Sequence, residues 1–342
     1  MKKTFTTALA ATALFGITAC KGGGSASGTK LIPEQATILV GIDVGGLTKT
    51  KLYSENKAMM ESAPEAKEMM EAAKGCNIDL EKMGSIIIGT DGAEPKPNVT
   101  AVISGDGIGV EANLTCIAEK AKEKAGEAPF TVEGKELKMK DDDGVGYIVD
   151  DKTVVIATKA WATATKDLID GKGKSAAEGP NKDLFGRADQ SKHIWFAGIL
   201  PAAATGQLKG SPAEGLKDIS GSVDLSNGVA FTVAAGTESA EKAEELKKQA
   251  EEQFGMAKGM AGMFGIPAGV VDSVKFGTDG NAISISAAAS TEDIKAIQES
   301  AGKMMGGGMG GPPPGMDEPP VPPPADEAAP EEGGDEPPAD GE

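Results

Sequence analysis

The amino-acid sequence predicts an α+β fold made of two tandem similar units, each an antiparallel sheet with helices on one face. Two observations support this class: strand-like segments come in pairs joined by tight turns, and charged, Ala-rich helical segments follow them. A third observation, one element order that recurs in both halves, indicates the duplication. The predicted parts are a first unit at residues 31–175, a second unit at 176–303 and a disordered, acidic, Pro/Gly-rich tail at 304–342.

The recurrence lies in the order of the elements, because residue identity between the two halves is low. In each half a buried-looking strand comes first, a strand ending in a turn follows, and a third strand leads into a charged helix. Each half then closes with a strand and a helix. The corresponding segments are 36–47 and 192–203, 81–92 and 217–228, 98–107 and 228–237, 110–124 and 239–253, and 152–170 and 281–299.

The segment SVDLSNGVAFTVAAG at residues 222–236 gives the clearest hairpin signal. Its residues alternate around Asn227-Gly228, a pair typical of the tight turns between antiparallel strands. Together with the recurring order, such segments make residues 31–302 resemble a group of uncharacterised bacterial lipoproteins and secreted proteins with duplicated α+β units. The resemblance implies the duplicated fold and no particular activity.

The first twenty residues have the pattern of an exported lipoprotein. Two lysines form a basic start, residues 4–17 are uncharged and mostly apolar or small, and the letters ITAC end the run at Cys20. The ITAC segment resembles the lipobox of bacterial lipoproteins. The resemblance implies removal of residues 1–19 and a diacylglyceryl group on the Cys20 thiol. Two or more acyl chains hold a protein stably at a bilayer. The alternative is an ordinary secretory signal with a stray cysteine.

Residues 20–30 are interpreted as the lipidated cysteine followed by a flexible, Gly/Ser-rich tether. By resemblance to Gram-negative lipoproteins, an Asp directly after the lipidated cysteine favours the inner membrane. This chain has Lys21 there, so the resemblance points to the outer membrane. The expected location is therefore the cell envelope, with a lipid anchor in the outer membrane of a Gram-negative bacterium.

The formal charge of −18 limits the partners of the chain. Loss of residues 1–19 removes two lysines, which takes the charge from −18 to −20. Such an acidic excess argues against nucleic acid and against an anionic bilayer face as partners. The tail at 304–342 has ten acids, no base and 11 of the 20 prolines, so it has almost nothing to bury. The expected partner is the membrane, reached through the anchor, and a protein or small-molecule partner stays unidentified.

Cys76 and Cys116 are the cysteines that remain once Cys20 carries lipid. The expected compartment is oxidising, where disulfides persist, so we expect these two thiols to be bonded. Cys76 closes a helical segment and Cys116 lies in the first two turns of the next helix, and two helices on one sheet face can bring them together. The alternative is two separate buried thiols that pack as small apolar groups.

The string GIDVGGLTK at residues 41–49 suggests a different function. Without Leu47 it resembles the first phosphate-binding hairpin of the ROK sugar kinases and of the wider actin-like ATPase fold. The resemblance implies an Asp that helps to hold a metal, and two Gly and a Thr that approach nucleotide phosphates. Those residues are Asp43, Gly45, Gly46 and Thr48. Leu47 breaks the spacing, and a helical segment at 54–75 stands where a second strand is required, so a kinase is a remote alternative.

The methionine-rich stretch FGMAKGMAGMFG at residues 254–265 suggests a soft-metal site. Met256, Met260 and Met263 fall on one face of a helix, and thioether clusters bind Cu(I). The other interpretation is that these unbranched side chains fill gaps in a core with few aromatic residues. Binding of copper or of a small ligand is therefore the second functional hypothesis.

Three further groups of residues are interpreted as structural. The glycines at 105–109 precede a helix and suit a turn and cap. The aspartates at 141–143 and 150–151 lack the spacing of a Ca²⁺ loop and suit a hairpin turn with solvated charges. His193 is the only histidine of the chain and suits the start of a strand.

These patterns predict no enzyme activity, no catalytic residue and no cofactor. The main hypothesis is a non-catalytic, lipid-anchored protein of the cell envelope with a structural or interaction role.

Overall fold

The computed structural model describes residues 28–306 of the chain, except residues 63, 141–142, 212 and 263–264. The predicted signal peptide, Cys20 and the tail from residue 307 onward lie outside the described residues. The chain divides into two parts, residues 1–301 and 302–342, and the sheet lies wholly within the first.

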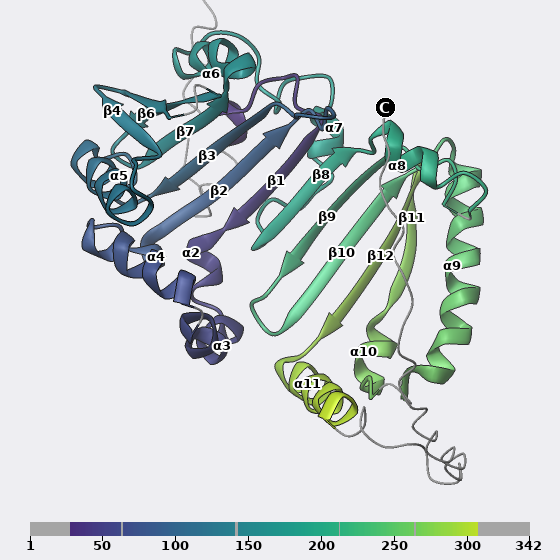
Figure 1. Cartoon of the computed structure of the whole chain (residues 1–342). Coiled ribbons are helices and arrows are strands. Elements are labelled where there is room, and N and C mark those ends of the chain that lie inside the picture. Colours follow the sequence, from purple (N-terminus) through teal and green to yellow (C-terminus); the bar gives the residue numbers. More distant parts are fainter. Residues whose placement is uncertain (1–27, 63, 141–142, 212, 263–264, 307–342) are drawn as a thin grey trace, which may run out of the picture. The chain divides into compact units, whose positions relative to one another are not determined.

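The part at residues 1–301 contains an α+β fold built on one sheet of 12 strands, which is the fold class that the sequence predicts (Figure 1). The strands are β1 (Ile38–Asp43), β2 (Met83–Thr90), β3 (Val99–Gly105), β4 (Phe130–Glu133), β5 (Glu136–Met139), β6 (Gly144–Asp150), β7 (Thr153–Thr158), β8 (Ile194–Ile199), β9 (Asp218–Asp224), β10 (Val229–Gly236), β11 (Lys275–Asp279) and β12 (Ala282–Ala289). Their order across the sheet is β11-β12-β10-β9-β8-β1-β2-β3-β7-β6-β5-β4, and all neighbours run antiparallel.

Helices connect and flank these strands. The α-helices are α2 (Val44–Leu47), α3 (Lys51–Ser62), α4 (Pro64–Gly75), α5 (Glu111–Ala125), α6 (Ala162–Ile169), α7 (Lys182–Phe185), α8 (Ala202–Gln207), α9 (Ala240–Ala261), α10 (Ala268–Ser273) and α11 (Thr291–Gly306). Three 3-10 helices are η1 (Thr29–Leu31), η2 (Leu80–Lys82) and η3 (Lys159–Trp161). None of the helices in the described part of the chain is both long and apolar enough to cross a membrane.

Local sequence signals account for several of these boundaries. β9 and β10 form the predicted hairpin around Asn227-Gly228, where Gly228 takes a φ of 113° that other residues rarely adopt. The Ser239 side chain begins α9 by accepting a hydrogen bond from the Lys242 N–H. The single helix expected at 54–75 is divided between α3 and α4, because Pro64, which lacks an N–H, suits the first position of a new helix.

The two halves share one strand order. The first half reads β1-β2-β3-β7-β6 and the second reads β8-β9-β10-β12-β11, with β4 and β5 as an addition to the first half. The long helices α5 and α9 each follow the third strand of their half. The halves meet at the β1–β8 pair and so contribute to one continuous sheet. Descent from a duplication, and the boundary between residues 175 and 176, stay predictions.

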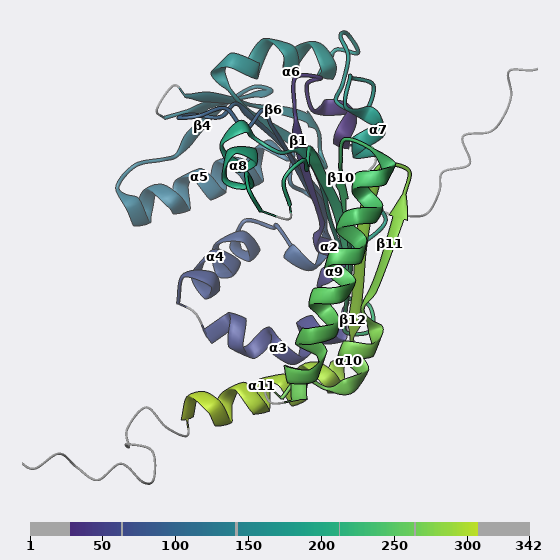
Figure 2. The same cartoon turned by 90° about the vertical axis from the view of Figure 1, so that its right-hand side faces the viewer.

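Buried side chains lie on both faces of the N-terminal half of the sheet. Adjacent residues of β3 show this, because Val102 packs in a cluster with η1, α6 and α7, whereas Ile103 packs in a cluster with α4 and α5. Figure 2 shows α4 and α5 on one side of the sheet and α7 on the other. Helices therefore cover both faces here, which corrects the expectation of a single covered face.

Both predicted boundaries with the terminal segments shift slightly. Thr29 is buried and Gly28 lies against the Ile87 side chain, so the packed fold begins before the expected end of the tether at residue 30. At the other end α11 continues to Gly306, beyond the expected start of the tail at residue 304.

Candidate functional site

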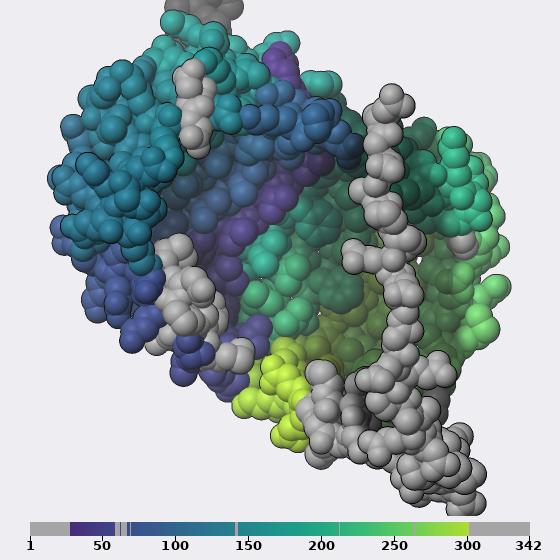
Figure 3. All heavy atoms as spheres, viewed as in Figure 1, coloured from purple at the N-terminus to yellow at the C-terminus, as the bar shows by residue number. Residues whose placement is uncertain are grey.

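The central strands β1, β2, β8, β9 and β10 have one face whose apolar side chains remain accessible to solvent. We call this the open face. It consists of Ile38, Val40, Ile42, Ile86, Ile88, Ile194, Phe196, Ile219, Val223, Phe231 and Val233, each of which is half-buried or exposed. Figure 3 shows the purple side chains of β1 and the green ones of the strands beside it on the floor of a hollow.

The strand register places these side chains together. Val40 lies opposite Ile88 on one neighbouring strand and opposite Phe196 on the other. Across the next pairs, Ile194 lies opposite Val223, and Val223 lies opposite Phe231. Directly opposed residues of antiparallel strands point to the same side of a sheet. The open face is therefore one continuous apolar surface that crosses from the first half of the chain into the second.

The other side of β1, β2 and β8 is packed except at Ile199, the last residue of β8. We call it the closed face, and Leu39, Ile87 and Trp195 on it are each 0% exposed. They belong to one core cluster with residues of η1 and α7. The Trp195 ring lies against Gly41, where a Cβ atom would come within 2.2 Å of the indole. Glycine at this position therefore leaves the room that the indole occupies beside β1.

The open face presents almost pure hydrocarbon to its surroundings. Each of its five strands is paired with a neighbour on both edges, so the backbone N–H and C=O groups are used within the sheet. The large side chains of the face are all Ile, Val or Phe; the register places Gly198, Gly221 and Ala235 between them, and Thr90 at one end, where its hydroxyl accepts a hydrogen bond from the Gly92 N–H. A ligand on this surface would be held by the hydrophobic effect, at about 25 cal/mol for each Å² of apolar surface removed from water.

A charged rim lies at one end of the open face, where α3 and the first turns of α11 approach each other (Figures 1 and 2). Lys51 lies 3.8 Å from Glu55 and 3.9 Å from Glu292, and Lys295 lies 3.3 Å from Glu55. All four side chains are substantially exposed, so each contact stabilises the fold only slightly. The rim sets two cations and two anions side by side.

The helices α4 and α5 flank the open face and are linked to each other. Cys76, directly after α4, and Cys116, within α5, lie at disulfide distance with Cα atoms 5.5 Å apart and their sulfur atoms bonded, which is the pair that the sequence predicts. Beside this link the helices part around a shallow groove of about 630 Å³. Ala73, Ile117 and charged side chains of both helices line it.

The kinase-like string forms a helical turn. Residues Val44–Leu47 are α2, and the Asp43 carboxylate begins this helix by accepting a hydrogen bond from the Gly46 N–H at 2.9 Å. The Thr48 hydroxyl donates to the Gly45 carbonyl, and the chain then continues into α3. A helix thus stands where the phosphate-binding hairpin needs its second strand.

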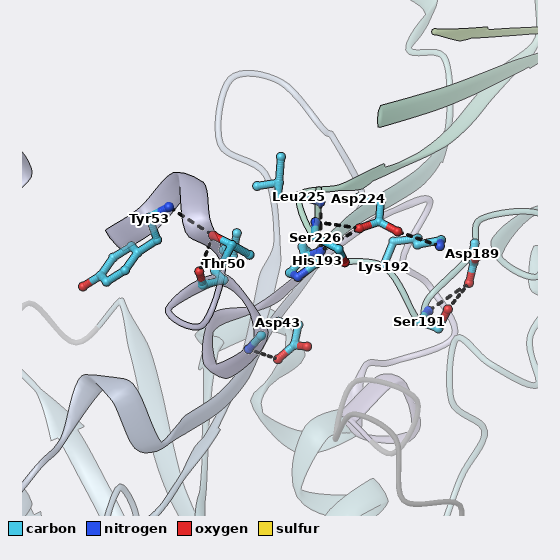
Figure 4. A network of polar contacts seen from close by, with 12 residues as sticks. Asp43, Thr50, Tyr53, Asp189, Ser191, Lys192, His193, Asp224, Leu225 and Ser226 are labelled. Carbon is cyan, nitrogen blue, oxygen red and sulfur yellow. Dashed lines mark hydrogen bonds and ion pairs between the residues drawn. The ribbon is translucent and has the colours of Figure 1, made fainter. Parts of the chain in front are cut away.

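His193 belongs to a polar network that fixes the start of β8 (Figure 4). The Leu225 N–H donates to His193 Nδ1 at 3.0 Å, and the Asp43 N–H donates to the His193 carbonyl at 2.8 Å. Beside them, Lys192 donates to Asp224 at 2.8 Å, and this ammonium group is the main reason that the pKa of the Asp224 carboxyl lies far below its usual range. The network ties β8 to β1 and to the β9–β10 turn, as a strand-start role for His193 requires.

The predicted turn residues also have structural partners. Asp143 precedes β6 and accepts a hydrogen bond from Lys96 at 2.7 Å, and Asp150 accepts one from the Lys152 N–H. Asp141 and Asp142 lie outside the described residues. Gly107, between β3 and α5, has a φ of 79°, which suits the expected turn. Among the described residues, no group of three or more His, Cys, Asp or Glu side chains is placed to hold a metal.

The methionines of the copper hypothesis are at the surface. Met256 and Met260 lie one helical turn apart on α9, with 71% and 48% of the residue exposed, and Met263 lies outside the described residues. Two such exposed side chains fill no gap in a core. The interpretation that these methionines fill gaps in the core is therefore wrong for Met256 and Met260.

Sequence reasoning missed the open face. Runs such as ILVGID in β1 are apolar at nearly every position, which is typical of a strand with both faces buried. The pattern thus identifies the strand but contains no signal that one side lacks a cover.

No protein-family model matches this chain, and no curated protein matches it. Among solved structures it is similar to TP0453, a Treponema envelope protein, in crystal form III with a TM-score of 0.47 and 8% identity. That alignment covers 80% of this chain and 97% of the other. Crystal form I of TP0453 gives the same TM-score and identity over 80% and 96%. This is a distant resemblance, and it identifies no ligand.

Proposed function

We propose that this chain is a non-catalytic, lipid-anchored protein of the cell envelope that acts by binding an apolar partner on the open face. The observation that carries the proposal is the continuous exposure of Ile, Val and Phe side chains across five neighbouring strands. Ile88 and Phe231 are 37% and 38% exposed, although each lies within a strand. Contiguous apolar surface of this kind is unfavourable in water and marks binding surfaces in soluble domains.

The location rests on the N-terminal sequence and gains support from the cysteines. The ITAC motif ending at Cys20 would provide the acyl anchor, and Lys21 favours the outer membrane of a Gram-negative bacterium. Cys76 and Cys116 lie at disulfide distance, which suits an oxidising compartment outside the cytoplasm. An anchored protein with an apolar binding surface would work at the bilayer surface.

Binding of the uncharged apolar dye Nile red tests the role of the open face. The informative variant is the double substitution Ile88→Thr with Phe231→Thr, because threonine keeps the β-branched shape that strands favour. The matched control is Ile199→Thr, since Ile199 is 40% exposed but lies on the other side of β8. We expect strong Nile red fluorescence with the wild type and the control, and loss of most of that fluorescence in the double variant. Equal fluorescence in all three proteins, with unchanged circular dichroism, would contradict the proposal.

Metabolic labelling with radioactive palmitate tests the anchor separately. The wild type should take up the label and fractionate with membranes, whereas Cys20→Ala should lose the label and become soluble. Equal labelling of the variant would show that the anchor assignment is wrong.

A second candidate function is soft-metal binding at α9, and the exposure of Met256 and Met260 favours it. Metal analysis after incubation with Cu(I) under reducing conditions would compare the wild type with Met256→Leu/Met260→Leu. Bound copper that disappears in the variant would support this function. Copper content that does not change would remove it.

A further inference from the structure

The composition of the open face and its rim indicates what kind of partner binds there. We infer that the open face binds the acyl chains of a zwitterionic phospholipid, with the headgroup at the charged rim between α3 and α11. This inference rests on the proposed function and names the class of its ligand.

Hydrogen bonding favours hydrocarbon over an extended peptide. The strands of the open face use their backbone groups within the sheet, and the Ile, Val and Phe side chains of the face have neither donors nor acceptors. A peptide laid on this surface would bring an N–H and a C=O for each residue and would lose water from them without compensation. An acyl chain brings no polar group, so its burial has no such cost.

The dimensions of the open face also suit acyl chains. Along β1 the face extends from Ile38 to Ile42, four residue steps of about 3.3 Å, or about 13 Å. One leaflet of a bilayer has a hydrocarbon depth of about 15 Å, half of the usual core thickness of about 30 Å. Neighbouring strands lie about 4.8 Å apart, so the furrows between rows of Ile and Val side chains have the width of single hydrocarbon chains.

The charged rim provides groups for a headgroup that carries both signs. Lys51 and Lys295 would face a phosphate, and Glu55 and Glu292 would face an amine or a quaternary ammonium group. These exposed ion pairs contribute little to stability, so exchanging them for contacts with a headgroup costs little. An anionic lipid is disfavoured, because it lacks the cation for the two glutamates and meets the net charge of −18 of the chain.

Lipid transfer from vesicles tests the inference in the full chain with Cys20→Ala, which cannot carry acyl chains of its own. The protein is incubated with dioleoylphosphatidylcholine vesicles that contain a radiolabelled trace of the same lipid. The vesicles are then removed by centrifugation, and the protein is collected by gel filtration. We expect lipid to stay with this protein and with its Ile199→Thr derivative, and to fall about tenfold or more in the Ile88→Thr/Phe231→Thr derivative.

Further measurements test the headgroup preference and the other possible occupants of the open face. Vesicles of dioleoylphosphatidylglycerol should deliver less lipid than those of the choline lipid, and Glu55→Gln/Glu292→Gln should reduce that preference. Absence of lipid on the parent protein, or equal lipid on all derivatives, would overturn the inference. So would a dimer in sedimentation that the Ile88→Thr/Phe231→Thr substitutions dissociate, because a second copy would then cover the face. Nile red binding without lipid binding would leave the proposed function standing and remove only this inference.

Discussion

On β1, β2 and β8 large apolar side chains occupy both faces, but those in the middle of the closed face are buried and those of the open face stay partly exposed. In β2, Ile87 is 0% exposed and its neighbour Ile88 is 37% exposed. In β8, Trp195 is fully buried, whereas Phe196 is half-buried. The difference shows that residue type determines which surfaces are apolar, and that the packing of η1 and α7 determines which of them becomes core.

The largest effect should come from the closed face. Trp195→Ala removes a fully buried indole and leaves a cavity, so we expect a loss of about 3–5 kcal/mol in the free energy of unfolding. Phe231→Ala on the open face should cost less than about 1 kcal/mol, because much of that ring is already in water. Urea unfolding followed by circular dichroism measures both. Equal losses in the free energy of unfolding would show that the two faces are equally covered.

The next effect concerns the α4–α5 pair beside the open face. Replacing Cys76 and Cys116 by alanine should destabilise the fold by up to roughly 4 kcal/mol, as the chain-entropy model gives for a sequence separation of 40. Urea unfolding with and without a reductant measures this, and the reductant should affect only the wild type. Recovery of the two cysteines as separately alkylated peptides from unreduced protein would show that no bond forms. Binding of Nile red should survive the double substitution, because the open face belongs to the sheet and not to these helices.

A substantial part of the fold could be predicted from the sequence, because its signals are local. The Asn227-Gly228 turn, the strand starting near Ile38 and the helix at 110–124 follow from residue patterns that act over a few positions. The pairing of Cys76 with Cys116 was predicted from the count of cysteines and the compartment expected from the N-terminal sequence. By contrast, the open face exists because no other part of the described chain packs on it. A continuous apolar run has the same pattern whether one face or both faces of the strand are covered.

The network at the start of β8 should make a small contribution to stability that depends on pH. The pKa of Asp224 lies below its unfolded value, mainly because of the hydrogen bond from Lys192, so the ionised carboxylate stabilises the fold. That contribution is complete above about pH 4, the usual Asp pKa, and is lost as the pH falls toward the lower folded value. Asp224→Asn should therefore cost roughly 1 kcal/mol at pH 7, and the difference from the wild type should shrink below pH 4.

Urea unfolding at neutral and acidic pH measures this effect. A difference that stays constant down to low pH would remove the ionised pair from the explanation. Nile red binding should not change in this variant, because the network lies at the strand ends and contributes no residue to the open face.

Photocrosslinking would show whether the open face takes up acyl chains. A phosphatidylcholine with a photoreactive diazirine in its acyl chain is offered in vesicles to the full chain carrying Cys20→Ala, and labelled residues are located by mass spectrometry. We expect label on open-face residues such as Val40, Phe196 and Phe231. Label concentrated on Ile199 of the closed face or on Met256 and Met260 of α9, or no label at all, would contradict it.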